Sequence, residues 1–144
     1  MMDDRYYMQL ALEEARKAAE LGEIPIGAVL VHNGEVVCRA HNMRETWQSA
    51  TAHAEVIVIE EACKKLARWR LSGCTLYVTV EPCVMCAGAI AWAQVSRIVF
   101  GASDEKRGYL RYAPDALHPK TIVEQGLLAD EASSLMKELF KRKR

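Results

Sequence analysis

The sequence has no net charge and no long hydrophobic run. Its 19 basic residues balance 19 acidic ones, so no global positive charge predicts a nucleic-acid partner, and such binding must rely on local patches. The first seven residues lack the basic start and apolar run of a secretory signal, and no apolar segment reaches membrane-spanning length. We therefore expect a cytoplasmic protein that does not interact with a membrane.

The five cysteines are an odd number, which does not suit a framework of disulfide bonds. The chain contains no internal repeat, no low-complexity segment and no linker. At 144 residues and 51% hydrophobic content, it is long enough for one proper core and too short for two ordinary domains. We expect a single domain over residues 1–144.

Two short motifs carry the chemistry: His53-Ala54-Glu55, and Pro82-Cys83-Val84-Met85-Cys86. A structural zinc site is normally closed by four Cys or His ligands, whereas a catalytic site keeps one position for water or substrate. His53, Cys83 and Cys86 supply three ligands, which predicts a catalytic zinc site. Glu55 is then free to move protons.

The spacing of these residues has a mechanical reason. Two cysteines separated by two residues at the start of a helix can turn both sulfurs toward one ion, with the thiolates facing the positive end of the helix. His53 and Glu55 lie near the start of the apolar stretch Ala52–Leu66, which favours a helix. We expect the two helix starts to lie side by side.

The remaining pattern predicts one mixed sheet inside an α/β sandwich. Asn33-Gly34 between two apolar runs predicts a hairpin, and a strand, helix and strand in succession predict a parallel crossover. The expected helices cover residues 4–21, 52–66, 83–91 and 130–141, and the expected strands cover 28–31, 35–40, 75–80, 97–101 and 121–124. Residues 102–120 are expected to form a long loop.

The combination of H-x-E with P-C-x-x-C is typical of zinc-dependent nucleobase deaminases. The chain resembles the cytidine deaminase superfamily, and within it most closely the bacterial tRNA adenosine deaminases. The resemblance covers nearly the full length. It is carried by the segments 24–29, 51–55, 76–90, 99–102 and 126–131.

This resemblance implies a three-layer α/β/α sandwich with a five-stranded mixed sheet, the cytidine deaminase-like fold. It implies a homodimer whose active sites lie near the subunit interface, with one Zn²⁺ per subunit. The implied reaction replaces an exocyclic amine of a nucleobase with a carbonyl and releases ammonia. The implied substrate is the wobble adenosine of a tRNA anticodon stem-loop, which becomes inosine.

The resemblance also implies substrate contacts at Asn42, at the backbone around Ala54 and in the polar loop that begins at Asp104. Asn42 can instead be a turn residue that ends a strand, and Asp104 can cap a turn. Trp47, in the loop that leads to His53, is the tryptophan that we expect nearest to substrate.

The chain departs from the tRNA enzymes over the segment Arg107–Lys120, where the family distinguishes substrates. Those enzymes usually have a glycine-rich run of small residues there. Tyr109, Arg111 and Tyr112 can stack on bases or close a pocket over a small ligand. The alternative is that they pack against the helix that carries the two cysteines.

Two other functions remain open. Neutral charge and the altered 102–120 loop favour a free base or nucleoside such as guanine or cytosine. The near full-length resemblance to the tRNA enzymes and the basic residues of 64–70 and 141–144 favour tRNA. The other alternative is a non-catalytic zinc-binding adaptor in which a fourth side chain completes the site. Its candidate ligands are Cys38, Cys63, Cys74, His41 and His118. Glu55 argues against the adaptor, which has no use for it.

Overall fold

The computed structural model describes residues 2–142 and contains five helices and five strands within that range. The helices are α1 Asp4–Glu20, α2 Ala54–Leu66, α3 Val84–Ala93, α4 Tyr109–Tyr112 and α5 Ala129–Arg142. The strands are β1 Gly27–His32, β2 Glu35–His41, β3 Cys74–Val80, β4 Arg97–Ala102 and β5 Ile122–Gln125.

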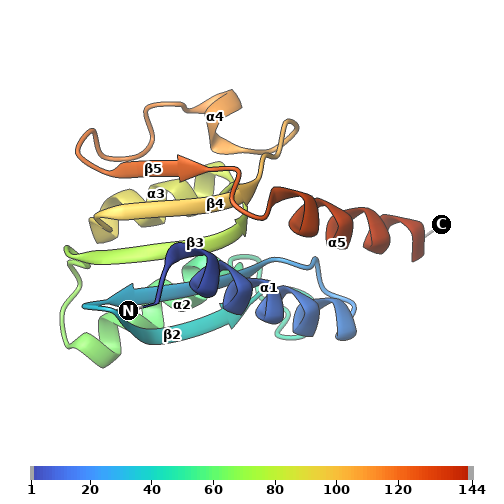
Figure 1. The fold of residues 1–144 in the computed structure, drawn as a ribbon, viewed down its shortest axis with the longest axis horizontal. Coiled ribbons are helices and arrows are strands. Elements are labelled where there is room, and N and C mark those ends of the chain that lie inside the picture. Colours follow the sequence, from blue (N-terminus) through green and yellow to red (C-terminus); the bar gives the residue numbers. More distant parts are fainter. Residues whose placement is uncertain (1, 143–144) are drawn as a thin grey trace.

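The five strands form one mixed sheet in the order β2-β1-β3-β4-β5 (Figure 1). Strand β1 is antiparallel to β2 and β3, while β3, β4 and β5 run parallel to one another. The β1–β2 connection turns at Asn33 and Gly34, whose φ angles of 51° and 75° are both left-handed. Asn-Gly suits this turn because both residues tolerate positive φ. The predicted hairpin and parallel crossover are therefore confirmed.

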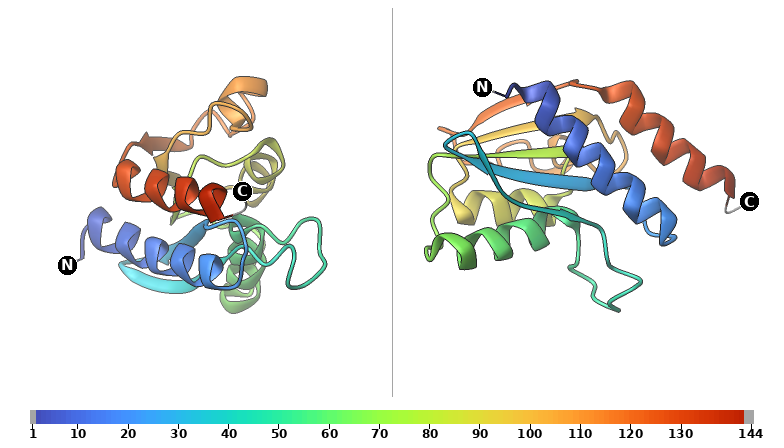
Figure 2. Two further views of the ribbon diagram at one scale, coloured as in Figure 1. Left: turned by 90° about the vertical axis from the view of Figure 1, so that its right-hand side faces the viewer. Right: turned by 60° about the horizontal axis from the view of Figure 1, so that its bottom comes forward.

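Helices cover both faces of the sheet, with α1 and α5 on one face and α2 and α3 on the other (Figure 2). The larger core lies under α2 and α3 and includes Leu30, Leu76, Ile90 and Phe100. Strands β1 and β3 alternate their side chains between this core and the smaller one beneath α1, so both strands are buried almost throughout. The expected three-layer α/β/α architecture is confirmed.

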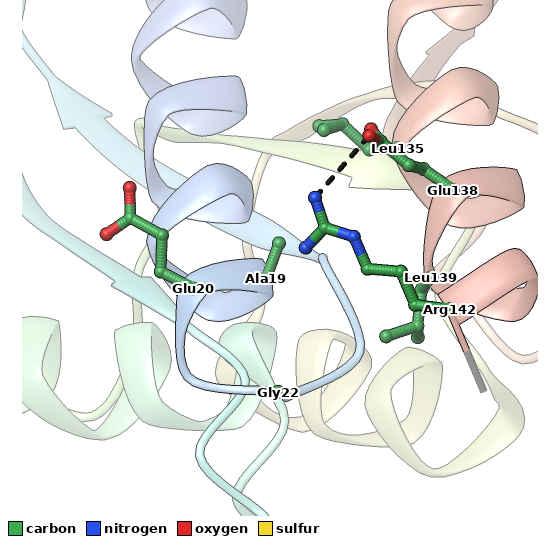
Figure 3. Close-up of a pocket in the computed structure, with 7 residues that line it drawn as sticks. All are labelled: Ala19, Glu20, Gly22, Leu135, Glu138, Leu139 and Arg142. Atoms are coloured by element: carbon green, nitrogen blue, oxygen red, sulfur yellow. Dashed lines mark hydrogen bonds and ion pairs between the residues drawn. The ribbon is translucent and has the colours of Figure 1, made fainter.

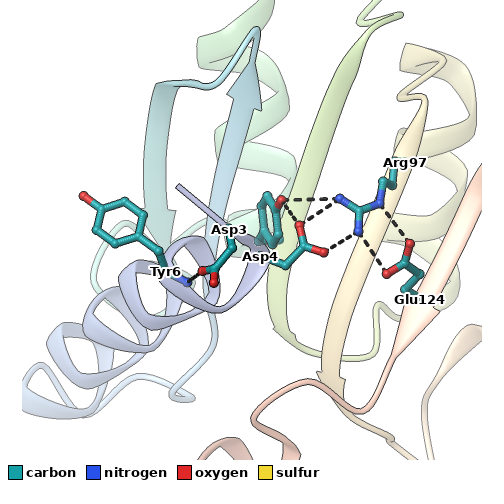
Figure 4. A network of polar contacts seen from close by, with 6 residues as sticks. Asp3, Asp4, Tyr6, Arg97 and Glu124 are labelled. Atoms are coloured by element: carbon teal, nitrogen blue, oxygen red, sulfur yellow. Dashed lines mark hydrogen bonds and ion pairs between the residues drawn. The ribbon is translucent and has the colours of Figure 1, made fainter. Parts of the chain in front are cut away.

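Helix α1 is fastened to the sheet by a polar network at its start (Figure 4). Arg97 on β4 contacts Asp4 at 2.5 Å and Glu124 on β5 at 2.9 Å. The Tyr77 hydroxyl donates to Asp4 at 2.6 Å. The hydrogen bonds from Arg97 lower the pKa of Asp4 although burial acts to raise it. The network joins α1 to three neighbouring strands.

The segment 102–120 differs from the expected uninterrupted loop because it contains the short helix α4. Its backbone is tied to the start of α3: Gly108 bridges Cys83, and the Tyr109 N–H donates to the Pro82 carbonyl at 2.9 Å. No signal in the sequence marks these contacts, since they join residues far apart in the chain. Among the described helices, none has the length and apolarity needed to cross a membrane.

Candidate metal centre and active site

The predicted ligands lie at the starts of two neighbouring helices. His53 is the N-cap residue of α2 and Cys83 is the N-cap residue of α3, while Cys86 lies in the first turn of α3. Neither N-cap side chain bonds to its helix, so both are available to a ligand. The positive ends of two helices thus point at one group, which favours thiolates there.

The geometry of this group fits zinc. The Nδ1 atom of His53 lies 3.5 Å from Sγ of Cys86 and 3.8 Å from Sγ of Cys83. Tetrahedral zinc with ordinary Zn–N and Zn–S bonds separates such atoms by about 3.6 Å. The three ligand atoms all lie within 4.8 Å of one another. The expected convergence of the two motifs is therefore present, and Nδ1 is the imidazole atom that faces the sulfurs.

The hydrogen bond between the two thiols shifts their pKa values in opposite directions. Cys86 donates to Cys83, which lowers the pKa of Cys83 to about 4 and raises the pKa of Cys86. The hydrogen bond to Cys83 also raises the pKa of His53. Cys83 is thus prepared to bind as a thiolate, and a cation on the group would favour loss of the second proton as well.

Glu55 is a buried carboxylate beside this group. Its side chain is only 3% exposed, and its Oε1 is the one buried side-chain oxygen or nitrogen in residues 2–142 that has no hydrogen-bond partner. Burial raises the pKa of Glu55 to about 7. An unpartnered buried carboxylate is costly, so the position calls for a ligand or a proton.

The described residues offer no fourth protein ligand. Only His53, Cys83 and Cys86 form a group with metal-binding spacing within residues 2–142. Cys38 instead donates to the Val58 carbonyl at 3.3 Å, and Cys74 is fully buried. Burial raises the pKa of each thiol, to about 12 for Cys38. A three-ligand set fits the open coordination of a catalytic zinc site.

Asn42 lies directly beside the candidate ligands. It is 4% exposed, and its Oδ1 accepts a hydrogen bond from the Ala54 N–H at 2.8 Å. The bond fixes Asn42 at the start of α2, next to His53. Asn42 directly follows the last residue of β2, as the turn interpretation had it, but its side chain also reaches the start of α2.

The substrate contacts expected at Asp104 and Tyr109 are a turn residue and a buried residue in the structure. Asp104 caps a turn, because its Oδ1 accepts from the N–H groups of Lys106 and Arg107. Tyr109 is only 2% exposed and packs edge-on against Phe100, so its ring offers no open face to a base. Its position therefore favours packing, the alternative to a substrate contact, for Tyr109.

Tyr112 remains accessible on α4. It is 62% exposed, and the Arg111 guanidinium lies over its ring at 5.3 Å. The basic cluster 64–70 begins at the far end of α2 from His53, and there Arg70 stacks on Trp69 at 4.4 Å. Residues 143 and 144 of the basic C-terminal segment lie outside the described range.

Two buried glutamates near the site were missed by sequence reasoning. Glu81 is 6% exposed and accepts the N–H groups of Asp104 and Leu110. Glu23 is 1% exposed and accepts three hydrogen bonds from Glu45 and Thr46. Each carboxylate holds one of the loops that begin or end at the candidate site. The sequence signal that could have identified Glu81 was its position directly before Pro82 of the second motif. No sequence signal marked Glu23.

A hollow elsewhere on the molecule has no such chemistry. It has a volume of about 310 Å³ and lies between the end of α1 and helix α5 (Figure 3). Its lining includes Leu135 and Leu139, together with Arg142, which contacts Glu138 at 3.5 Å. None of the residues of the candidate site lines it.

Comparison with known proteins gives consistent matches. The family model for MafB19-like deaminases matches residues 2–144. A tRNA-specific adenosine deaminase of Bacillus subtilis is 49% identical over 100% of this chain and 92% of its own length. A tRNA-specific adenosine deaminase of Aquifex aeolicus is 40% identical over 99% of this chain and 97% of its own.

Solved structures agree with these matches. A structure from a study of A-to-I editing by tRNA:A34 deaminases has a TM-score of 0.85 and 44% identity, covering 90% of this chain and 98% of that one. A guanine deaminase from Nitrosomonas europaea has a TM-score of 0.84 and 25% identity, covering 96% and 85%. The fold is thus shared by enzymes that act on different substrates.

Proposed function

The chain belongs to the MafB19-like deaminase family, and on that premise we propose that it converts adenosine to inosine at the wobble position of tRNA. The reaction consumes water, breaks the bond between C6 and the exocyclic nitrogen, leaves a carbonyl and releases ammonia. The observation that carries the proposal is a buried carboxylate with a free oxygen beside three convergent metal-binding side chains. The tRNA relatives, similar over the full chain, support the choice of substrate.

The proposed resident metal is one zinc ion held by His53, Cys83 and Cys86. When bound, zinc supplies the Lewis acidity that makes water a nucleophile near neutral pH. His53 presents Nδ1, and the two cysteines present sulfurs from the first turn of α3. Removing any one of the three should therefore weaken zinc binding as well as lower activity.

Glu55 is proposed to move the protons. Its raised pKa suits a group that must both accept and donate a proton near neutral pH. It would take one proton from water and deliver it to the ring nitrogen, and would then carry the remaining hydroxyl proton to the departing amine, which leaves as ammonia. The free Oε1 is the atom proposed to hold that proton.

Substrate contacts are proposed around this carboxylate. Asn42 uses Oδ1 to hold Ala54, which leaves its amide N–H groups for acceptors on the base. The Ala54 N–H is thereby used within the protein, so any base contact near Ala54 must come from other backbone atoms. Tyr112 and Arg111 on α4 offer an exposed aromatic and cationic surface to the anticodon loop. Asp104 is proposed to shape the protein segment 104–110 through the turn that it caps.

The test measures inosine and ammonia formed by the zinc-loaded protein. The substrates are a tRNA anticodon stem-loop with adenosine at the wobble position and a panel of free bases and nucleosides. Glu55→Gln serves as the blank and should retain zinc, with turnover lower by about 10²–10⁴. Glu14→Gln is the matched control, because Glu14 is equally buried but bonds only to Lys17 and Arg39.

A second candidate is the deamination of guanine. The fold of the Nitrosomonas guanine deaminase matches this chain about as well as that of the tRNA enzyme does. Activity on guanine alone would establish this alternative.

Activity of Glu55→Gln equal to wild type would remove Glu55 from catalysis. A lack of activity on every substrate would favour the non-catalytic adaptor.

We also propose that two copies assemble through α3. Its outward face carries Val84, Met85 and Trp92, which are 41%, 39% and 82% exposed. Large apolar side chains gathered on one helix beside a site mark an interaction surface. Sedimentation should give a dimer for the wild type and a monomer for Trp92→Glu. A monomeric wild type would contradict this part of the proposal.

A cytoplasmic location belongs to the same proposal, because the proposed substrate is tRNA. Fractionation of cells that carry a tagged chain would test it. Recovery outside the cytoplasm would contradict it.

A further inference from the structure

The loop formed by residues 43–51 projects from the body of the molecule between β2 and α2. Figure 2 shows this segment, coloured teal, reaching beyond the sheet and helices in both views. Its two ends meet where the Met43 N–H donates to the Ala52 carbonyl at 3.0 Å. Ala52 immediately precedes His53, so the base of the 43–51 loop borders the candidate site.

The loop carries exposed groups suited to an RNA substrate. Trp47 is 55% exposed, and Arg44 is also exposed. An aromatic ring and a guanidinium can stack on a base and pair with a phosphate.

The loop has few means of holding its position. Inside it, the Trp47 N–H donates to Met43 at 2.8 Å and the Ser49 N–H donates to Arg44 at 3.0 Å. Those bonds shape the loop but do not attach it to the body. A projecting segment with exposed backbone is ordinarily free to open locally.

A single buried carboxylate provides the attachment. Oε1 of Glu23 accepts the Glu45 N–H at 3.1 Å, and Oε2 accepts both the N–H and the hydroxyl of Thr46 at 2.6 Å. Within residues 2–142, every hydrogen bond that joins residues 44–51 to the chain outside 42–53 ends on Glu23.

The environment of Glu23 favours its ionised form. Its side chain is only 1% exposed, and burial acts to raise its pKa. The hydrogen bonds from Thr46 and Glu45 outweigh burial and lower that pKa. Glu23 therefore stays ionised, and charge-assisted hydrogen bonds are about twice as strong as neutral ones.

We infer that Glu23 is a positioning residue for substrate binding, which holds the 43–51 loop so that Arg44 and Trp47 meet the RNA beside the metal centre. Glu23 does not touch the reacting atoms. It keeps the loop in the binding-competent arrangement before substrate arrives. If only a small fraction of the molecules has that arrangement, the apparent affinity for substrate falls in proportion to that fraction. The bound complex still reacts at the same rate.

The inference predicts a split between KM and kcat for Glu23→Gln. Glutamine keeps one acceptor but turns an NH₂ group toward the backbone donors, so about one charge-assisted bond is lost. That loss corresponds to a KM for the stem-loop raised about tenfold, with kcat within about twofold of wild type. Thr46→Val removes only the hydroxyl and should raise KM by about threefold.

The matched control is Glu14→Gln. Glu14 is 5% exposed and accepts from Lys17 and Arg39 at 2.8 and 3.0 Å, but from no loop backbone. Glu14→Gln should therefore leave the KM for the stem-loop at the wild-type value. An equal rise in KM for Glu14→Gln would overturn the inference, because general destabilisation would then explain both variants.

The kinetic readout rests on the proposed function, so hydrogen exchange supplies an independent one. Exchange at Glu45 and Thr46 should accelerate at least about tenfold in Glu23→Gln, with zinc content unchanged. Faster exchange without any stem-loop activity in the wild type would reject the proposed function but retain the attachment. Unchanged exchange, or a fall in kcat at constant KM, would overturn the role of Glu23.

Discussion

Replacing Gly108 with alanine should detach the 104–110 segment from the metal helix. A Cβ atom at this position would lie 1.9 Å from Oε2 of Glu81 and 2.5 Å from the Asp104 carbonyl. The φ angle of Gly108 is −64°, so the constraint is one of space and not of backbone conformation. The carboxylate cannot move aside freely, because it accepts the N–H groups of Asp104 and Leu110 at 3.2 and 3.1 Å.

The cost follows from these contacts. Forcing an extra carbon into a packed site costs about 1–3 kcal/mol, and a hydrogen bond to a charged group contributes about 1.5–3 kcal/mol. If one of the two bonds to Glu81 is lost, the free energy of unfolding should fall by about 3 kcal/mol. For a chain of this length that corresponds to a Tm lower by about 10 °C.

The assay is urea unfolding of zinc-loaded protein, combined with a double-mutant cycle. Glu81→Ala removes the oxygen that the new Cβ would meet, so Gly108→Ala should cost less in that background. We expect the combined loss to be smaller than the sum of the single losses by about 1–2 kcal/mol. Additive losses, or a Gly108→Ala variant within about 0.5 kcal/mol of wild type, would refute the steric argument.

Three further predictions concern other parts of the molecule. Because Arg97 lowers the pKa of Asp4, Asp4→Asn should be less stable than wild type near neutral pH in urea unfolding. The difference in stability should vanish as the pH falls below 3.8, the ordinary pKa of this carboxyl group. Gly88→Ala should lower Tm, because a second copy is proposed to pack on this face of α3. A rise in Tm would mean that the face is open to solvent, since the new Cβ meets no other part of the chain within 4 Å. Cys86→Ser should bind zinc at least about tenfold more weakly in a competition assay with a chelator, whereas Cys63→Ser, outside the site, should bind zinc as wild type does.

The sequence predicted much of this architecture because local patterns determine it. Asn33-Gly34 specified the hairpin, and the apolar run before Pro82 specified a buried strand of the parallel pair. The H-x-E and P-C-x-x-C motifs placed the metal group because both lie at helix starts, where spacing fixes direction. The segment 102–120 was harder, since α4 has only four residues and depends on contacts with the start of α3.

Tyr109 and Tyr112 show the limit of such reasoning. They lie three residues apart and have the same chemistry, so the sequence offered both as surfaces for a base. The structure buries Tyr109 against Phe100 and leaves Tyr112 62% exposed. The difference arises from the bond between the Tyr109 N–H and the Pro82 carbonyl, a contact across 27 residues that no local pattern records.

The buried glutamates separate structural roles from catalytic ones by their hydrogen bonds. Glu14 is satisfied by two cationic side chains, and Glu23 and Glu81 are satisfied by donors of the loops that they hold. Glu55 is equally inaccessible, yet one of its oxygens has no partner within the described residues. Because fixed donors favour the ionised form of a carboxylate, only the unpartnered one is left free to exchange a proton during a reaction. Burial alone would select all four residues, whereas burial without a complete set of donors selects Glu55.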